Sequence, residues 1–413
     1  MLEIPYGTKR LKIQLPNSWK TMCASPRNLP SLKSDEIAEA IGNPIGCGTL
    51  SELSKGSKTA AIVVDDHTRP TPAYEIIPHL LKELADSGIR EDNITIIAGL
   101  GGHRPMTEQE FELKVGRGVF KHVKVVNHDY TSNFVYYGKS KAGVPIWLNR
   151  TFAEADVKLG IGGLIPHVGA GYAAGAKIVL PGICSLETIR LNHELLSGKH
   201  LGNVENPLRH DIEDVARIIG IDFTVNVVMN LDLHACGVFA GDFLKAHRAG
   251  VKMAKEVYEV PIPEKADVTL VSAFPVDADL IQSAKALYHS IEATKAGGTI
   301  VLFTASPEGL GFHALYTYEY RNCRVFQEDL KKLAHMAEER EIIVCSDGVK
   351  EEDFHMSLST RYSNEKVLSY YPEKIKLVWP PERVLKRISG RHRPDAKCII
   401  LPYGAITIPR CPV

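Results

Sequence analysis

Short apolar runs alternate with longer amphipathic stretches along this chain, and no other feature limits the possible folds as strongly. Apolar runs at residues 60–64, 94–100, 122–126 and 157–164 each predict a buried strand, and helical patterns lie between them. Strands that alternate with helices are typical of βα units around a largely parallel sheet. We therefore predict the α/β class.

The same alternation continues after residue 259, which indicates a second domain. Helical patterns there separate strands predicted at 266–273, 299–306, 342–347 and 398–405. The Pro-rich stretch VPIPEK stands before this region and is typical of a linker. We predict two α/β domains with largely parallel sheets, residues 1–260 and residues 261–413, with the boundary near 258–266.

The charge balance and the hydropathy narrow the classes of partner. With 49 Lys+Arg against 49 Asp+Glu, the chain has no net field to attract nucleic acid or an anionic membrane, so a small-molecule ligand is expected. The chain shows no signal-peptide pattern and no run of about eighteen apolar residues, which predicts a cytoplasmic protein. The eight cysteines form no CxxC pair, so most are expected to be core residues.

Charged and imidazole side chains gather where the predicted strands of the first domain end. In open α/β sheets, ligands bind beyond the carboxyl ends of the strands. The repeated His and Arg at these ends indicate one shared site. The residues concerned are Asp65, Asp66, His67, Arg69, His103, Arg104, His128, Asp129 and His167.

Lys177 follows a stretch, residues 169–176, that is glycine and alanine apart from Tyr172 and contains no carboxylate. Lysine is rarely buried without a partner, and small residues allow a ligand to approach the backbone closely. A desolvated lysine loses its proton and becomes a nucleophile, so a covalent cofactor linkage would explain the pattern. A lysine that reaches solvent, or binds a phosphate through its charge, is also compatible with the sequence.

Three histidines are candidates for metal binding or proton transfer. Ser185 is the expected N-cap of a helix on which His193 shares the apolar face, so His193 is either a core histidine or a metal ligand. His103 and His167 each end a predicted strand at the same edge of one sheet. Two imidazoles facing one pocket could take and give protons at neutral pH.

Two further pairs could contact a substrate. Arg69 stands beside a helix N-terminus, which favours an organic acid, although Asp66 and Arg69 could equally form a pair that pins the turn. Gln282 and Lys285 lie three apart on one predicted helix face and could either contact a substrate or remain solvated. The chain has no GxGxxG fingerprint, P-loop or HExxH motif.

Taken together, these motifs resemble the lactate racemase family, the nickel-pincer-nucleotide enzymes. The resemblance covers about residues 55–315, and the spacing of ten and sixteen residues from His167 through Lys177 to His193 is highly specific. The motifs that carry it are DDHTRPTP, GGHRPMTEQE, PHVGAGYAAGAKIVLPGI, ETIRLNH and QSAKAL.

The resemblance implies a role for each candidate residue and an active site in an interdomain cleft. Lys177 would carry the cofactor, a pyridinium-3-thioamide-5-thiocarboxylic acid mononucleotide, and His193 would complete the coordination of its nickel. His103 and His167 would be the acid/base pair. Asp66 and Arg69 would position cofactor and substrate, while Gln282 and Lys285 would contact the substrate.

The implied reaction is inversion of the hydroxyl-bearing carbon of a 2-hydroxy acid by proton-coupled hydride transfer to and from the cofactor. Cofactor-synthesis proteins would be needed for loading. Where the lactate enzyme has bulky aromatics, this chain has Val168 and Gly169, and Ile165 replaces an acid, so we expect a substrate larger than lactate. The alternatives are a metal- or nicotinamide-dependent enzyme using the same histidines, and a non-catalytic nickel-cofactor carrier.

Overall fold

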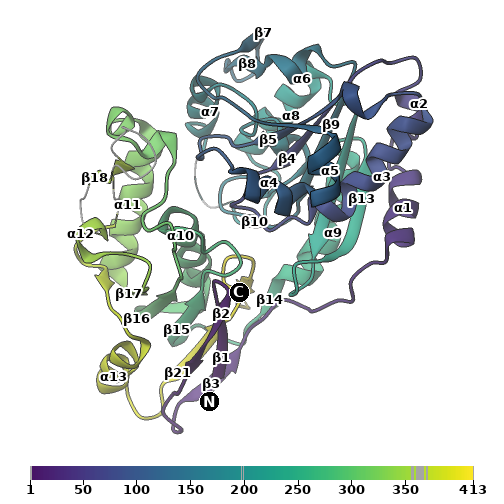
Figure 1. Ribbon diagram of the computed structural model, residues 1–413. Coiled ribbons are helices and arrows are strands. Elements are labelled where there is room, and N and C mark those ends of the chain that lie inside the picture. Colours follow the sequence, from purple (N-terminus) through teal and green to yellow (C-terminus); the bar gives the residue numbers. More distant parts are fainter. Residues whose placement is uncertain are drawn as a thin grey trace. The chain divides into compact units, whose positions relative to one another are not determined.

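The computed structural model describes residues 2–196, 198, 200–354, 358–359, 367–368 and 371–412. The chain forms two compact units (Figure 1): Arg27–Glu256 is one, and Met1–Pro26 together with Val257–Val413 is the other. In the part of the chain that is described, no helix is long and apolar enough to cross a membrane.

The unit Arg27–Glu256 is built on a six-stranded sheet in the order β13-β12-β9-β4-β5-β6. Every neighbouring pair is parallel except β12 and β13, which are antiparallel. The strands are β4 (Ala60–Asp65), β5 (Ile94–Gly99), β6 (Lys124–Asn127), β9 (Val157–Gly163), β12 (Phe223–Met229) and β13 (Ala235–Gly241). The four strands predicted for this region are therefore confirmed, and the α/β class with them.

Helices follow most of these strands, as the alternation predicts. They include α3 (Ala73–Asp86), α4 (Glu108–Val115), α5 (Arg117–His122), α6 (Arg150–Glu154), α7 (Leu186–His193), α8 (Pro207–Ile219) and α9 (Lys245–Tyr258). Ser185 is the N-cap of α7, as predicted, because its hydroxyl accepts a hydrogen bond from the Thr188 amide. A further hairpin, β7 (Phe134–Lys139) with β8 (Pro145–Asn149), lies outside the large sheet.

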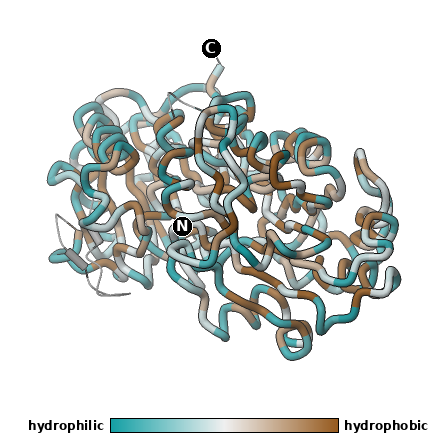
Figure 2. Tube along the Cα trace, turned by 90° about the horizontal axis from the view of Figure 1, so that it is seen from above, coloured by the Kyte–Doolittle hydropathy of each residue, from teal (hydrophilic) through white to brown (hydrophobic). Residues whose placement is uncertain are grey.

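The second unit contains a fully parallel six-stranded sheet in the order β20-β17-β16-β15-β21-β3. Its strands are β3 (Lys20–Cys23), β15 (Ala266–Ser272), β16 (Thr294–Phe303), β17 (Glu341–Cys345), β20 (Lys376–Leu377) and β21 (Lys397–Leu401). The main helices are α10 (Leu280–Ser290), α11 (Arg324–Glu339) and α13 (Pro381–Arg391). The central strands β15, β17 and β21 are largely buried. Hydrophobic stretches (brown in Figure 2) alternate with hydrophilic ones (teal) along the trace.

The first 26 residues belong to this second unit and not to the expected domain 1–260. The reason is strand pairing: β3 adds to the edge of the sheet beside β21, with Lys20 opposite Lys397 and Cys23 opposite Ile400. The N-terminal hairpin of β1 (Leu2–Tyr6) and β2 (Lys9–Ile13) supplies buried side chains to the same core.

Part of the expected linker VPIPEK is a strand instead. β14 (Glu259–Pro261) pairs in parallel with β22 (Ile408–Arg410), and the side chains of Glu259 and Arg410 form an ion pair 2.8 Å long. Main-chain hydrogen bonds thus order a segment whose prolines indicated a loop. The cysteines also differ from expectation, because only four of the eight are buried: Cys184, Cys236, Cys345 and Cys398.

Candidate active site

Three neighbouring parallel strands bring the candidate residues to one edge of the sheet. β4 lies between β5 and β9 and runs parallel to both, so the three strands end on the same side. Asp66 follows β4, His103 follows β5, and His167 follows β9 in the short strand β10 (Pro166–His167). Since neighbouring strands lie about 5 Å apart, the two histidines follow strands about 10 Å apart.

Asp66 and His103 form a largely buried hydrogen-bonded pair. Asp66 Oδ2 accepts a hydrogen bond of 2.5 Å from His103 Nδ1, and the Asp66 residue is only 2% exposed. Burial opposes ionisation of this carboxyl group, but the charge and hydrogen bond of His103 outweigh burial and hold its pKa well below the usual range. Because Nδ1 donates to the carboxylate, the neutral ring of His103 carries its lone pair on Nε2, as a base requires.

The opposite tautomer is favoured at His167. Its Nδ1 accepts hydrogen bonds from the amides of Gly169 and Ala170, at 3.2 and 3.1 Å. A nitrogen that accepts two main-chain hydrogen bonds carries no proton, so the neutral ring is protonated on Nε2. The hydrogen-bond partners therefore favour a base at His103 and a proton donor at His167.

Lys177 lies in a turn of 3-10 helix, Gly175–Ile178, and its side chain retains some exposed surface. Among the described residues, its amine makes no hydrogen bond or ion pair. Burial lowers the pKa of this amine to about 7, and the nearby charges of Arg69 and Arg209 act in the same direction against Asp66 and Asp65. This shift raises the neutral fraction of the Lys177 amine, as a nucleophilic lysine requires.

His193 ends helix α7 with one ring nitrogen already committed. Its Nδ1 donates a hydrogen bond of 2.9 Å to the carbonyl oxygen of Ile189. Burial lowers the pKa of His193 to about 4, and the charges of Lys177 and His103 add to this effect. The ring is neutral at physiological pH with its lone pair on Nε2, which is the state and the second contact typical of a metal-binding histidine. Because the charges of Lys177 and His103 act on the His193 ring, both residues lie near it.

Comparison with known proteins finds relatives of one family. A family model described as the lactate racemase N-terminal domain matches residues 6–203. A lactate racemase of Lactiplantibacillus plantarum is 31% identical over 331 residues, which cover 76% of this chain and 77% of that protein. The chain belongs to the lactate racemase family. A lactate racemase of Thermoanaerobacterium thermosaccharolyticum is also 31% identical, over 330 residues that cover 77% of each chain.

Solved structures extend the likeness to the full length. The lactate racemase apoprotein from Thermoanaerobacterium thermosaccharolyticum matches with a TM-score of 0.81 and 26% identity, covering 99% of both chains. A Thermotoga maritima protein with 20% identity and a TM-score of 0.68 shares the fold. As a member of the lactate racemase family, this chain is an isomerase of the racemase type.

The turn after β4 that carries Arg69 is held by a residue that the sequence analysis missed. Lys114, in α4, is only 7% exposed, and its Nζ donates to Asp65 Oδ1 at 2.9 Å and to the Arg69 carbonyl at 2.7 Å. Thr68 links the rest of the turn, since its hydroxyl donates to Asp66 Oδ1 at 2.6 Å and accepts from Arg69 Nη1 at 2.8 Å. Leu113 beside it is 71% exposed, so α4 buries the charged neighbour and exposes the apolar one.

Other strand-end residues have structural contacts in place of a shared ligand site. Arg104 pairs with Glu110 at 2.6 Å, beside the Thr107–Glu110 capping box that the sequence predicts. His128 is buried and its Nε2 lies 2.9 Å from the Cys184 carbonyl. Asp129 accepts hydrogen bonds from the Thr131 amide and the Thr131 and Ser132 hydroxyls. The predicted convergence of all strand-end side chains was therefore too broad.

Gln282 and Lys285 belong to the other unit, in the first turns of α10. The Asp279 carboxylate caps this helix by accepting a hydrogen bond of 2.7 Å from the Gln282 amide. Lys285 Nζ donates to the Gln282 side-chain oxygen, as expected for two residues on one helix face. Gln282 is only 3% exposed, so it is not a solvated surface residue. Their contact with a substrate stays a prediction.

Proposed function

We propose that this chain is a 2-hydroxy acid racemase that carries a nickel-pincer nucleotide on Lys177. The observation that carries the proposal is the Lys177 amine, which has a pKa of about 7 and no hydrogen-bond partner among the described residues. Burying an amine without a hydrogen-bond partner destabilises the folded chain, and a neutral amine of this kind is suited to forming a covalent bond. When bound, the nucleotide would supply the acceptor for the hydride that leaves the substrate carbon.

The neighbouring residues fit such a group. His193 would bind the nickel through Nε2, because its Nδ1 is held by the Ile189 carbonyl and its ring stays neutral. Asp66 and Arg69 would position the cofactor and the substrate from the turn after β4.

The two histidines would move the hydroxyl proton from opposite sides. His103 Nε2 takes the proton from the hydroxyl of one enantiomer, while the Asp66 carboxylate stabilises the imidazolium that forms. His167 gives a proton to the oxygen from Nε2 once the carbon has been inverted. With the two roles exchanged, the same steps serve the other enantiomer. Arg69 would anchor the substrate carboxylate through its guanidinium.

Intact mass spectrometry tests the proposal most directly. The chain purified from a host that makes the cofactor should carry an adduct of nucleotide size, and Lys177→Ala should lack it. Lys252→Ala, at an exposed lysine of α9, is a matched control that should keep the adduct. An unmodified wild-type chain from such a host would contradict the proposal and favour a metal- or nicotinamide-dependent enzyme. An adduct without racemase activity would favour a carrier.

We further propose a substrate larger than lactate, such as an aryl, dicarboxylic or sugar-derived 2-hydroxy acid. The sequence based this expectation on both Val168 and Gly169, and the structure removes Gly169 from the argument. A Cβ added at Gly169 would lie 3.0 Å from Leu208 Cδ2 and 3.2 Å from Leu196 Cδ1, so leucine side chains already fill that space. The argument therefore depends on Val168, which is partly exposed.

Turnover of larger 2-hydroxy acids should exceed that of lactate. We expect kcat/KM for the best larger acid to exceed that for lactate by roughly tenfold or more. The reason is that a larger substrate would fill apolar space that lactate leaves empty. The measurement is racemisation of a panel of single enantiomers, followed by chiral chromatography. Val168→Phe should reverse the preference by filling the space, whereas Leu208→Phe, at the packed position, should not. Faster turnover of lactate than of every larger acid would refute the substrate proposal.

A further inference from the structure

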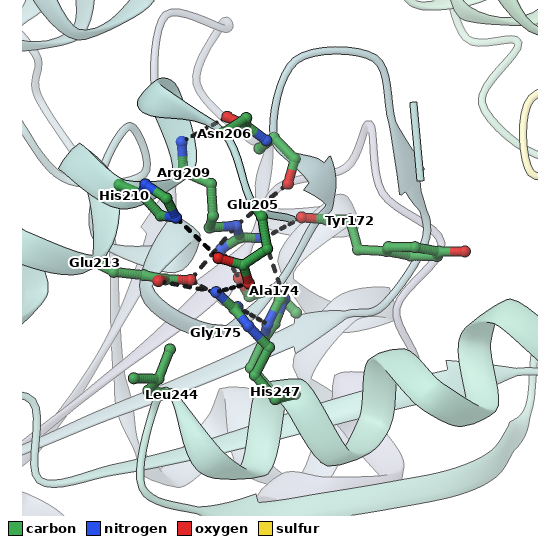
Figure 3. Close-up of polar contacts among 12 residues, drawn as sticks. Tyr172, Ala174, Gly175, Glu205, Asn206, Arg209, His210, Glu213, Leu244 and His247 are labelled. Carbon is green, nitrogen blue, oxygen red and sulfur yellow. Dashed lines mark hydrogen bonds and ion pairs between the residues drawn. The ribbon is translucent and has the colours of Figure 1, made fainter. Parts of the chain in front are cut away.

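Arg209, on helix α8, is a fully buried cation that none of the proposed chemical steps uses. It is 0% exposed, and its guanidinium points at the carbonyl oxygens of residues 170–174 (Figure 3). Nε donates to Ala170 O at 3.2 Å, Nη1 to Ala174 O at 3.4 Å, and Nη2 to the carbonyl of Tyr172. With a further contact to Ala173 O at 3.5 Å, one side chain thus holds four carbonyl groups of the segment between His167 and Lys177.

The backbone that Arg209 holds has an unfavourable conformation. Gly171, Ala174 and Gly175 have φ values of 75°, 62° and 58°, in the left-handed region. Ala174 has a Cβ and therefore pays a steric cost there that glycine avoids. Such strain persists only where the surroundings impose it. Three convergent carbonyl groups would also repel one another without the cation between them.

A second layer of charged residues supports the same segment. His247 Nε2 lies 2.9 Å from Ala173 O and 3.1 Å from Arg209 Nη2, and its Nδ1 lies 3.1 Å from Arg248 Nη1. Glu213 binds Arg248 with both carboxylate oxygens, at 2.7 and 3.0 Å, and lies 3.8 Å from Arg209 Nε. Burial keeps His247 neutral by lowering its pKa, and the Arg209 charge adds to this effect.

We propose that Arg209 is a positioning residue of this active site, whose guanidinium holds the strained segment 170–174 so that His167 and Lys177 keep their separation and orientation. His167 begins this part of the chain and Lys177 follows it by three residues. The inference builds on the proposed role of Lys177. The charge of Arg209 also reaches Lys177, where it favours the neutral amine.

Hydrogen exchange of the cofactor-free chain tests the positioning role. In Arg209→Met, the amides of residues 170–177 should exchange at least tenfold faster, while those of β4 and β5 keep their wild-type rates. Arg217→Met is the matched control, because Arg217 lies on the exposed face of α8 and pairs with Asp214 at 3.6 Å. Unchanged exchange in 170–177, or equal acceleration across the unit, would overturn the proposal.

Arg209→Lys provides a second variant should Arg209→Met fail to fold. It keeps the charge but loses the planar fork, so a single ammonium cannot reach all the carbonyls. Exchange of residues 170–177 should still accelerate several-fold in this variant. Wild-type exchange rates in a folded Arg209→Lys chain would overturn the proposal.

The pH profile of Lys177 labelling adds a readout that mere filling of space would not change. Reductive methylation of the folded, cofactor-free chain, measured by peptide mass spectrometry, should rise with a midpoint near pH 7 in the wild type, because only the neutral amine reacts. In Arg209→Met the midpoint should rise, since one cation is lost while Arg69, Asp65 and Asp66 remain. An unchanged midpoint would count against the proposal.

These measurements use no cofactor, so they separate this inference from the proposed function. If the exchange and labelling results appear but no nucleotide is ever found on Lys177, the proposed function fails and the positioning role stands. If the nucleotide is found on Lys177 and the Arg209 variants behave as wild type, the positioning role fails alone.

Discussion

Alanine in place of His103 should lower racemisation by about 10³-fold or more while the chain keeps its nickel. General acid–base groups contribute about 10²–10⁴-fold, and the proposed reaction must move the hydroxyl proton in both directions. His167→Ala should have a similar effect, because neither histidine can replace the other on the opposite side of the substrate. The measurements are racemisation by chiral chromatography and nickel content of the purified protein.

His193→Ala is the variant that separates metal binding from proton transfer. This variant should lose nickel as well as activity. The contact of His193 Nδ1 with the Ile189 carbonyl leaves Nε2 as the metal ligand, and the substitution removes that atom. His128→Ala is not a suitable control, since this buried histidine contacts the Cys184 carbonyl and its loss would disturb the core. His335→Ala, at an exposed helix position of the other unit, should leave both quantities unchanged. Retained nickel in His193→Ala would refute the metal role.

Asparagine in place of Asp66 should lower kcat by about 10²–10⁴-fold without loss of the nucleotide adduct. The carboxylate holds the proton on Nδ1 of His103 and stabilises the imidazolium; a neutral amide can do the first only weakly and the second not at all. Asp66 forms no covalent bond to the nucleotide. The loaded variant should therefore differ in mass from the loaded wild type only by the substitution itself.

The pH dependence of stability checks the same residue. The pKa of Asp66 is depressed in the folded chain, so its ion pair contributes stability above the unfolded pKa of about 3.9, and this contribution is lost as the pH falls through the folded value. As the pH falls from the unfolded pKa to the folded pKa of Asp66, the free energy of unfolding of the wild type should therefore decrease by a contribution that Asp66→Asn lacks. Equal acid sensitivity of the two chains, with unchanged kcat, would contradict the assigned role of Asp66.

The sheet strands were predictable because parallel strands buried on both faces are continuous apolar runs. β4, read as AAIVV, and β9, read as VKLGIGG, both show this pattern. The strands β12 and β13 were not predicted. Neither was β3, which is short and mostly exposed and forms only an edge of the sheet. Its pairing with β21 joins segments at opposite ends of the chain, which local periodicity cannot show.

The site was predictable where a residue type was unusual for its local setting. Lys177 after a run of small residues and His193 on an apolar helix face both had such a signal. Lys114 and Arg209 had none, because their importance comes from contacts with Asp65 and Ala170, which are 49 and 39 residues away in sequence. In the sequence, Arg209 and Glu213 are only two opposite charges four residues apart on α8, a spacing equally typical of an exposed ion pair.

The pairing of β3 with β21 also sets an order of events during synthesis. β3 is made within the first 26 residues, yet its partner strand begins at Lys397. At about 5–20 residues per second, β3 waits on the order of tens of seconds for that partner. All strands of the unit Arg27–Glu256 are complete much earlier. The unit that carries Lys177 can therefore fold on the ribosome while the other unit is still missing its C-terminal strand.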